Sequence, residues 1–208
     1  MYYCDLYVNL NKQNYREMLD YLAEQGYRCI GYPINGLKKE LVKDIEKYAD
    51  NLNLLLLKRS ILRKRFRIKS GILYAIDINY IELRNLNKIL KITSIIHIPD
   101  VETVNVKMLK RLIKIKKLIF EINYVNLLTS IYNRYINRKT LPGVINYLKF
   151  LIMESRLMIS SGASSKEQIL SPKEAIMSIL GLFDIHQYMD NFIRTIPYNI
   201  VSKYVQLV

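Results

Sequence analysis

Histidine and carboxylate side chains are the first groups to examine for hydrolytic chemistry. His97 and His186 are the only histidines among the 208 residues. A hydrolytic centre with two or three metal ions needs several histidine and carboxylate ligands that converge at strand ends. Two histidines this far apart cannot supply that set. We therefore interpret both as structural residues, His97 in a buried strand and His186 in a helix.

Other catalytic patterns are equally weak. Pairs of carboxylates such as Asp77 with Glu82, or Glu121 with Glu154, have no spacing that favours acid–base catalysis. The chain lacks a G-x-S-x-G nucleophile elbow, a Walker A loop and a G-x-G-x-x-G fingerprint. The sequence thus predicts no catalytic residue, no metal ligand and no cofactor bound by the protein.

Basic residues, in contrast, are concentrated in one short tract. Between positions 58 and 69 there are seven Lys or Arg and no acid, namely Lys58, Arg59, Arg63, Lys64, Arg65, Arg67 and Lys69. From Arg63 onward the odd positions are basic, and Phe66 and Ile68 alternate with them. An extended segment would present these cations on one face, where they could bind phosphates and release counterions. We predict that this tract contacts RNA; the alternative is a solvated loop.

A second basic group is predicted on a helix. Its members follow i, i+3, i+4, i+7 spacing and share one face: Lys107, Lys110, Arg111 and Lys114. Met108, Leu109, Leu112 and Ile113 cover the other side, so an ordinary amphipathic surface helix would explain the spacing as well. Arg134, Arg138 and Lys139 form a weaker third group, in which Tyr132 and Tyr135 could stack on unpaired bases.

The overall charge supports a polyanionic partner. Thirty-two Lys and Arg stand against eighteen Asp and Glu, which gives a formal net charge of +14. Half of the residues are apolar, so the chain can bury a substantial core in a single domain, residues 1–208. Cys4 and Cys29 are predicted in buried strands and provide no disulfide framework. With no apolar run long enough for a membrane span and no signal peptide, we expect a cytoplasmic protein.

Apolar runs and helical periodicity alternate along the chain. Strands are predicted at 2–9, 27–32, 54–57, 72–76, 80–83, 94–98, 118–122 and 157–160. Helices are predicted at 14–25, 37–48, 86–90, 105–116, 141–156, 171–180 and 185–195, with a last one from Pro197. This alternation indicates an α/β fold with a parallel sheet, either closed as a TIM-like barrel or open and doubly wound.

The C-terminal third carries the most distinctive pattern. A strand runs into Ser160-Ser161-Gly162-Ala163, and a polar loop, the helix start Ser171-Pro172 and the pair Gly181-Leu182 follow. This order resembles the protein subunit of about 30 kDa found in archaeal and eukaryotic ribonuclease P. Residues 120–122 look like the family's Glu-Ile strand, and residues 3–8 look like its opening strand.

The resemblance implies a TIM-like barrel related to the polymerase-and-histidinol-phosphatase (PHP) metal hydrolases, but without their metal site. Those enzymes place His-x-His just after the first strand, where this chain has Tyr7 and Asn9 beside Asp5. The family acts with the catalytic RNA, precursor tRNA and other protein subunits, especially a small ferredoxin-like one, and not with membranes. The RNA would carry out the Mg²⁺-dependent removal of 5′ leaders in tRNA processing. The RNA-contact residues proposed above depend on charge alone.

Two other functions stay open on the sequence. One is a divergent metal-dependent phosphoesterase of the PHP type, against which the low histidine content speaks. The other is a generic basic RNA-binding module, which would bind without preference for a particular structured RNA.

Overall fold

Seven parallel strands form the centre of the protein. The computed structural model describes residues 2–63, 68–132, 141–187 and 189–206. Within these residues, each strand of the sheet pairs with the next one along the chain. The strands are β1 (Tyr3–Asp5), β2 (Tyr27–Pro33), β3 (Leu55–Leu62), β4 (Leu73–Asp77), β5 (Ile95–Ile98), β6 (Ile119–Asn123) and β7 (Leu157–Ser160).

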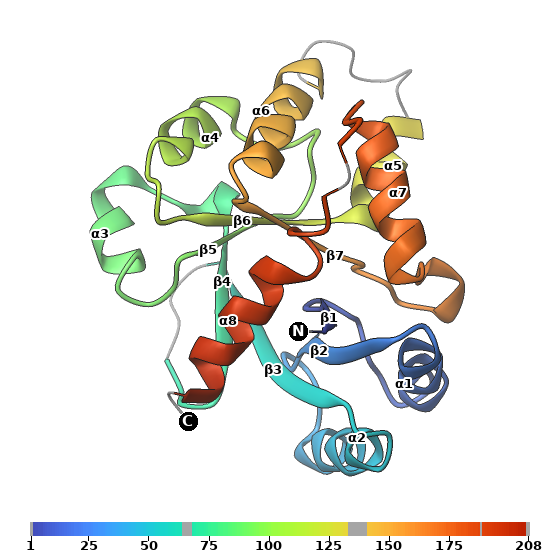
Figure 1. Ribbon diagram of the computed structural model, residues 1–208. Helices are drawn as coiled ribbons and strands as arrows, with labels where there is room; N and C mark the ends of the chain where they lie inside the picture. Colours follow the sequence, from blue (N-terminus) through green and yellow to red (C-terminus); the bar gives the residue numbers. More distant parts are fainter. Residues whose placement is uncertain (1, 64–67, 133–140, 188, 207–208) are drawn as a thin grey trace.

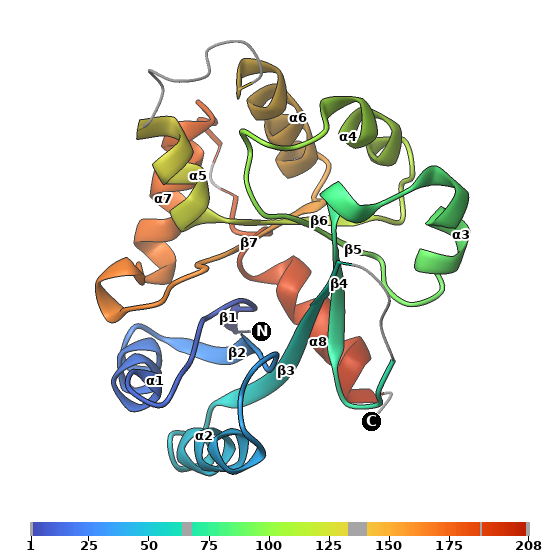
Figure 2. The same cartoon turned by 180° about the vertical axis from the view of Figure 1, so that it is seen from behind.

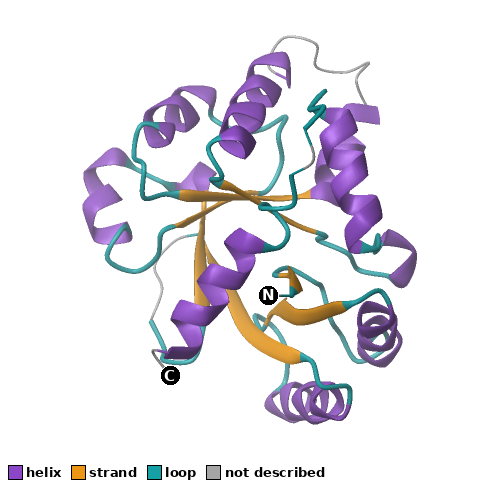
Figure 3. Cartoon of the chain, in the orientation of Figure 1, coloured by secondary structure: helices purple, strands orange, loops and turns teal. Residues whose placement is uncertain are grey.

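Helices surround the strands (Figures 1 and 3). They are α1 (Tyr15–Glu24), α2 (Lys39–Asn51), α3 (Leu86–Ile89), α4 (Val106–Ile113), α5 (Tyr124–Tyr132), α6 (Leu141–Met153), α7 (Pro172–Leu182) and α8 (Thr195–Gln206). The 3-10 turns are η1 (Ile78–Tyr80), η2 (Leu83–Asn85) and η3 (Lys166–Gln168). No helix in the described part is long and apolar enough to cross a membrane.

Alternation along the strands divides the apolar residues into two cores. Outward side chains such as Ile96 and Phe120 pack with the surrounding helices in the larger cluster. Inward ones such as Cys4, Cys29 and Ala75 form a second, separate cluster inside the ring of strands. A parallel sheet covered on both faces explains why its strands read as nearly continuous apolar runs. The predicted α/β barrel-like fold is confirmed, and both cysteines are buried and free.

The ring closes between β1 and β7 by main-chain contacts outside regular strand pairing. Just beyond the strands, Gly162 N–H donates to the Tyr7 carbonyl at 2.8 Å, and Asn9 N–H donates to the Ala163 carbonyl at 2.8 Å. Within the strands themselves, Cys4 N–H of β1 donates to the Ile193 carbonyl at 3.3 Å, and Ile159 N–H of β7 donates to the neighbouring Phe192 carbonyl at 3.0 Å. Residues 192–193 therefore occupy the place of an eighth strand.

Helix α8 closes one end of the barrel. Its residues Ile196 and Val201 belong to the inner cluster, together with Leu73 and Ile95, the first residues of β4 and β5. In Figure 1 the helix lies in front of the strands, and in Figure 2, seen from behind, it lies beyond them. The α8 helix thus seals the N-terminal end of the strands, and the polar residues of the barrel lie toward the other end.

Several boundaries differ from the sequence predictions. The predicted strand at 80–83 is wrong, because the Asp77 carboxylate accepts a hydrogen bond from Asn79 N–H and starts the 3-10 turn η1 directly after β4. The predicted helix at 185–195 is also wrong, since the backbone of residues 192–193 pairs with β1 and β7. The first strand is shorter than predicted, β3 continues to Leu62, and α5 was not predicted.

Candidate nucleic-acid interface and the polar centre of the barrel

A buried ion pair lies inside the barrel. Arg59 of β3 and Glu121 of β6 are both 0% exposed. The Arg59 guanidinium meets the carboxylate with both terminal nitrogens, and Nη2 lies 2.7 Å from Oε2. Nη1 also donates to the Leu6 carbonyl, and His97 Nδ1 lies 3.2 Å from the same Oε2. Three strands therefore contribute to one fixed polar network.

The neighbours of this network are shaped to hold it. The Tyr7 ring stacks on His97 with ring centres 5.5 Å apart, and the Arg59 guanidinium lies 5.6 Å from the same ring. Gly31 leaves the space that Arg59 uses: a Cβ there would lie 2.8 Å from Arg59 Cδ and 2.3 Å from the Leu6 carbonyl oxygen. A larger residue at 31 would therefore displace both.

Electrostatics keep the pair ionised. Burial alone would raise the pKa of Glu121, but the Arg59 charge and the hydrogen bonds from His97 and Arg59 outweigh burial and lower it to about 2. Arg59, Glu121 and His97 are each 3% exposed or less, so the network is closed to solvent. Among the described residues, no group of three or more His, Cys, Asp or Glu is placed to hold a metal ion. We interpret the network as a structural element that holds β3, β5 and β6 together inside the barrel.

The Ser160–Ala163 segment lies at the seam between β1 and β7. Ser161 N–H donates to Asp5 Oδ1 at 2.9 Å, and Tyr7 N–H reaches the same oxygen at 3.3 Å. Burial raises the pKa of Asp5 to about 6, and these hydrogen bonds only partly offset it. Gly162 has a φ of +68°. This conformation suits glycine and brings the backbone across to β1. The Ser160–Ala163 segment therefore helps to close the barrel.

The described residues of the predicted basic tract do not share one surface. The prediction that Arg59 contacts RNA is wrong, because its side chain is fully buried against Glu121. Lys58 points outward from β3 and pairs with Glu46 of α2 at 2.7 Å. Arg63 is 63% exposed, with Nε 3.4 Å from Asp77 Oδ2. Lys69 is exposed. The remaining predicted residues, Lys64, Arg65 and Arg67, lie outside the described residues.

The second predicted group lies on α4 and the residue after it. Lys107, Lys110, Arg111 and Lys114 are all exposed. Leu109 and Leu112, at 0% exposure, pack on the opposite side of the helix. None of the four cations forms an ion pair with another described side chain. Arg134, Arg138, Lys139 and Tyr135 lie outside the described residues.

The histidine predictions have different outcomes. His97 lies in the buried strand β5, as predicted. His186 is exposed in the loop after α7, with Nε2 3.3 Å from Asp184, so the helix predicted there is wrong. The sequence interpretation also missed the joint role of Arg59, His97 and Glu121. For His97 and Glu121 the available signal is a single ionisable residue in a buried apolar strand, whereas Arg59 follows Lys58 in a basic run and gives no such signal.

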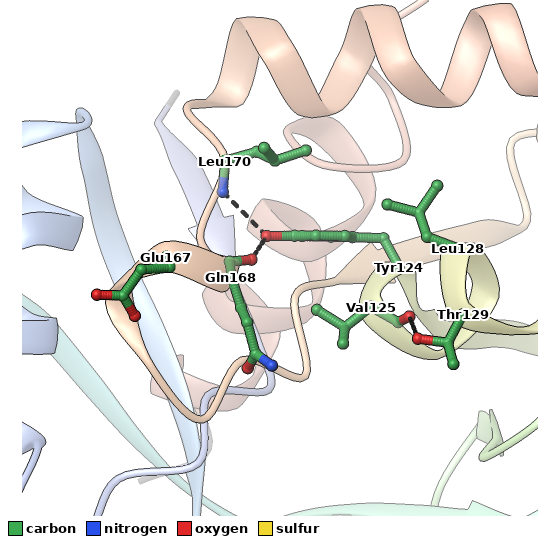
Figure 4. A pocket seen from close by; sticks show the side chains of 7 residues that line it. All are labelled: Tyr124, Val125, Leu128, Thr129, Glu167, Gln168 and Leu170. Carbon is green, nitrogen blue, oxygen red and sulfur yellow. Dashed lines mark hydrogen bonds between the residues drawn. The ribbon is translucent and has the colours of Figure 1, made fainter. Parts of the chain in front are cut away.

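A surface pocket of about 380 Å³ lies between the start of α5 and the loop after β7 (Figure 4). Its wall is mainly apolar and comes from the start of α5 and the loop after β7: Tyr124, Val125, Leu128, Thr129, Glu167, Gln168 and Leu170. The Tyr124 hydroxyl donates to the Gln168 carbonyl and accepts from Leu170 N–H at 2.9 Å. These bonds tie the two walls together.

Comparison with known proteins gives distant structural likeness. No family model matches the chain, and no curated protein matches it. Its structure is similar to 3-dehydroquinate dehydratase from Aquifex aeolicus VF5, with 14% identity, a TM-score of 0.42, and coverage of 88% of this chain and 99% of that one. It is also similar to a truncated 3-deoxy-D-arabino-heptulosonate 7-phosphate synthase from Thermotoga maritima, with 11% identity, a TM-score of 0.27, and coverage of 75% of this chain and 50% of that one. Likenesses this distant carry no inference about activity.

Proposed function

We propose that this protein is an RNA-binding subunit of ribonuclease P that stabilises the catalytic RNA during removal of 5′ leaders from precursor tRNA. The order of short motifs from the opening strand to Gly181-Leu182 supports this proposal. A net charge of +14 supports it as well, because surplus cations favour a polyanionic partner.

One structural observation favours RNA binding over catalysis by the protein. Arg59 and Glu121 neutralise each other inside the barrel, whereas the four cations from Lys107 to Lys114 face solvent without ion-pair partners among the described residues. Exposed, unpaired cations can release counterions from phosphates, and a buried pair cannot. The exposed position of these four cations therefore supports the proposal of surface binding to a polyanion.

Reconstitution tests the proposal. The purified chain is combined with the ribonuclease P RNA and the small ferredoxin-like subunit in Mg²⁺, and the rate of 5′-leader cleavage is measured. We expect no cleavage by the protein alone and an increased rate when it joins the RNA and its partner. Failure to bind that RNA at moderate salt, or no effect on the rate, would refute the proposal.

Specificity separates this function from a generic basic module. The matched measurement is affinity for the ribonuclease P RNA against a structured RNA of equal length and unrelated fold, at the same salt. Tighter binding to the first is expected. Equal affinity for both would favour a generic module.

A further inference from the structure

The charge of this protein is divided between two sides of the barrel. Residues 84–118, which run from η2 through α3 and α4 to the start of β6, contain nine Lys or Arg and two Asp or Glu, a net charge of +7. Residues 15–51, which contain α1 and α2, have six Lys or Arg and seven Asp or Glu, a net charge of −1. Half of the net charge of +14 therefore comes from residues 84–118, and residues 15–51 contribute none of the surplus.

Helices α3 and α4 are neighbours on the outside of the barrel in both views (Figures 1 and 2), away from α1 and α2. We name this surface the α3–α4 wall and define it by its exposed cations: Arg84, Lys88, Lys91, Lys107, Lys110, Arg111, Lys114, Lys116 and Lys117. Arg84 pairs with Glu82 at 2.5 Å. The Asp100 carboxylate accepts hydrogen bonds from Glu102 N–H and the Ser130 hydroxyl. Most of the wall is thus available to an external anion.

The wall also lacks the groups that bind unpaired bases. Residues 84–118 contain no Phe, Tyr or Trp, although aromatic residues make up 11% of the chain and about four would be expected in 35 positions. Its one imidazole, His97, is buried. Proteins hold single-stranded nucleic acid largely by stacking bases on aromatic side chains. The composition of the wall therefore disfavours a single strand as its partner.

A double helix needs no such stacking. Double-stranded RNA is recognised mostly by its shape, its phosphates and its 2′-hydroxyls. On α4 the cations recur one helical turn apart, roughly 5–6 Å between neighbours. They span about 10 Å from Lys107 to Lys114 at about 1.5 Å per residue. Along α4 the wall therefore presents regularly spaced cations to solvent.

We propose that the α3–α4 wall binds the phosphate backbone of an RNA double helix. The proposal rests on the proposed function for the identity of the polyanion, and it adds the form of RNA and the surface. Regions of mixed charge such as α2, where Lys39, Lys43 and Lys47 alternate with four acids, are not part of the binding surface.

The test compares a fluorescently labelled RNA duplex with one of its own strands, chosen to be unstructured, by anisotropy at several salt concentrations. The wall variant is Lys107→Gln/Lys110→Gln/Arg111→Gln/Lys114→Gln. The matched control removes four exposed lysines around α2: Lys38→Gln/Lys39→Gln/Lys43→Gln/Lys47→Gln. Circular dichroism and thermal melting establish that both variants are folded.

We expect the wild type to bind the duplex more tightly than the strand. The wall variant should lose at least about 30-fold in duplex affinity at 0.15 M salt, which corresponds to two lost phosphate contacts, and its salt slope should become shallower by about two or more. The control should change little. A wall variant that binds like the control, or a wild type that prefers the single strand, overturns this inference and leaves the proposed function standing. A wild type that binds no RNA overturns both.

Discussion

Removing the charge of Glu121 should destabilise the protein far more than removing the charge of Glu46, a partly exposed glutamate on helix α2. Glu121→Gln keeps the shape of the side chain but leaves the buried Arg59 cation without its counter-ion. Breaking a buried pair at one side typically costs about 3–5 kcal/mol. The control, Glu46→Gln, breaks the pair with Lys58, whose side chains are both 36% exposed, and should cost about 1 kcal/mol or less.

The pKa gives a second route to the same magnitude. Its value for Glu121 is lowered from 4.5 to about 2, and at 1.36 kcal/mol per unit this corresponds to about 3 kcal/mol. A carboxyl group whose pKa is lowered by folding stabilises the folded protein at any pH above its pKa in the unfolded chain. For Glu121 this contribution is lost as the pH falls from about 4.5 through about 2. The variant should therefore lose stability at pH 7 and show a flatter pH dependence in that window.

Urea unfolding followed by circular dichroism measures both effects. The double variant Arg59→Met/Glu121→Leu should recover much of the stability, because no buried charge is left unpaired. Equal losses for Glu121→Gln and Glu46→Gln, or a steep dependence between pH 4.5 and 2 that survives in Glu121→Gln, would refute the assigned role of the pair.

Three further variants test the surrounding framework by the same unfolding assay. Gly31→Ala should lower the stability by about 3 kcal/mol, because the added Cβ would collide with Leu6 and Arg59. The control Gly181→Ala, whose Cβ would have nothing within 4 Å, should be neutral or slightly stabilising. Equal effects would mean that Leu6 and Arg59 do not lie this close to Gly31. Asp5→Asn should stabilise the protein by about 2 kcal/mol at pH 7. Because the pKa of Asp5 is raised from 3.8 to about 6, ionising this carboxyl destabilises the fold as the pH rises through that window, and the variant avoids about 3 kcal/mol of that cost while losing about 1 kcal/mol to an unpaired amide. A stabilisation that persists below pH 4 would contradict this explanation. Ile196→Ala should lower the stability by about 2–4 kcal/mol, because it opens a cavity between α8 and the barrel. The control Lys203→Ala, at an exposed position of the same helix, should cost about 0.5 kcal/mol or less. A similarly small change in both variants would mean that α8 does not seal the barrel.

The sequence predicted the features that depend on local pattern. Apolar runs such as 94–98 and 118–122 identified β5 and β6 closely, because a strand buried on both faces needs apolar side chains throughout. Ser171-Pro172 identified the start of α7, where Ser171 forms a full capping box with Glu174. The cation face of α4 followed from helical spacing, and its four members are indeed exposed.

Features that depend on distant partners were missed. Arg59 belongs to a basic run, yet its position on β3 points it inward, and its counter-ion lies 62 positions away. Helical periodicity suggested a helix at 185–195, but the carbonyls of Phe192 and Ile193 are needed by β1 and β7. In each case a long-range contact outweighs the local preference, and a single sequence does not show which distant residues will meet.

The irregular closure of the barrel has a consequence for biosynthesis. The amide of Cys4 binds the carbonyl of Ile193, which lies 189 positions further along the chain. Until residues 192–206 have been synthesised and have left the ribosome, the first strand lacks this partner and α8 cannot cover the inner apolar residues. The ring therefore closes late in synthesis, and β1, although made first, is among the last strands to gain all its partners.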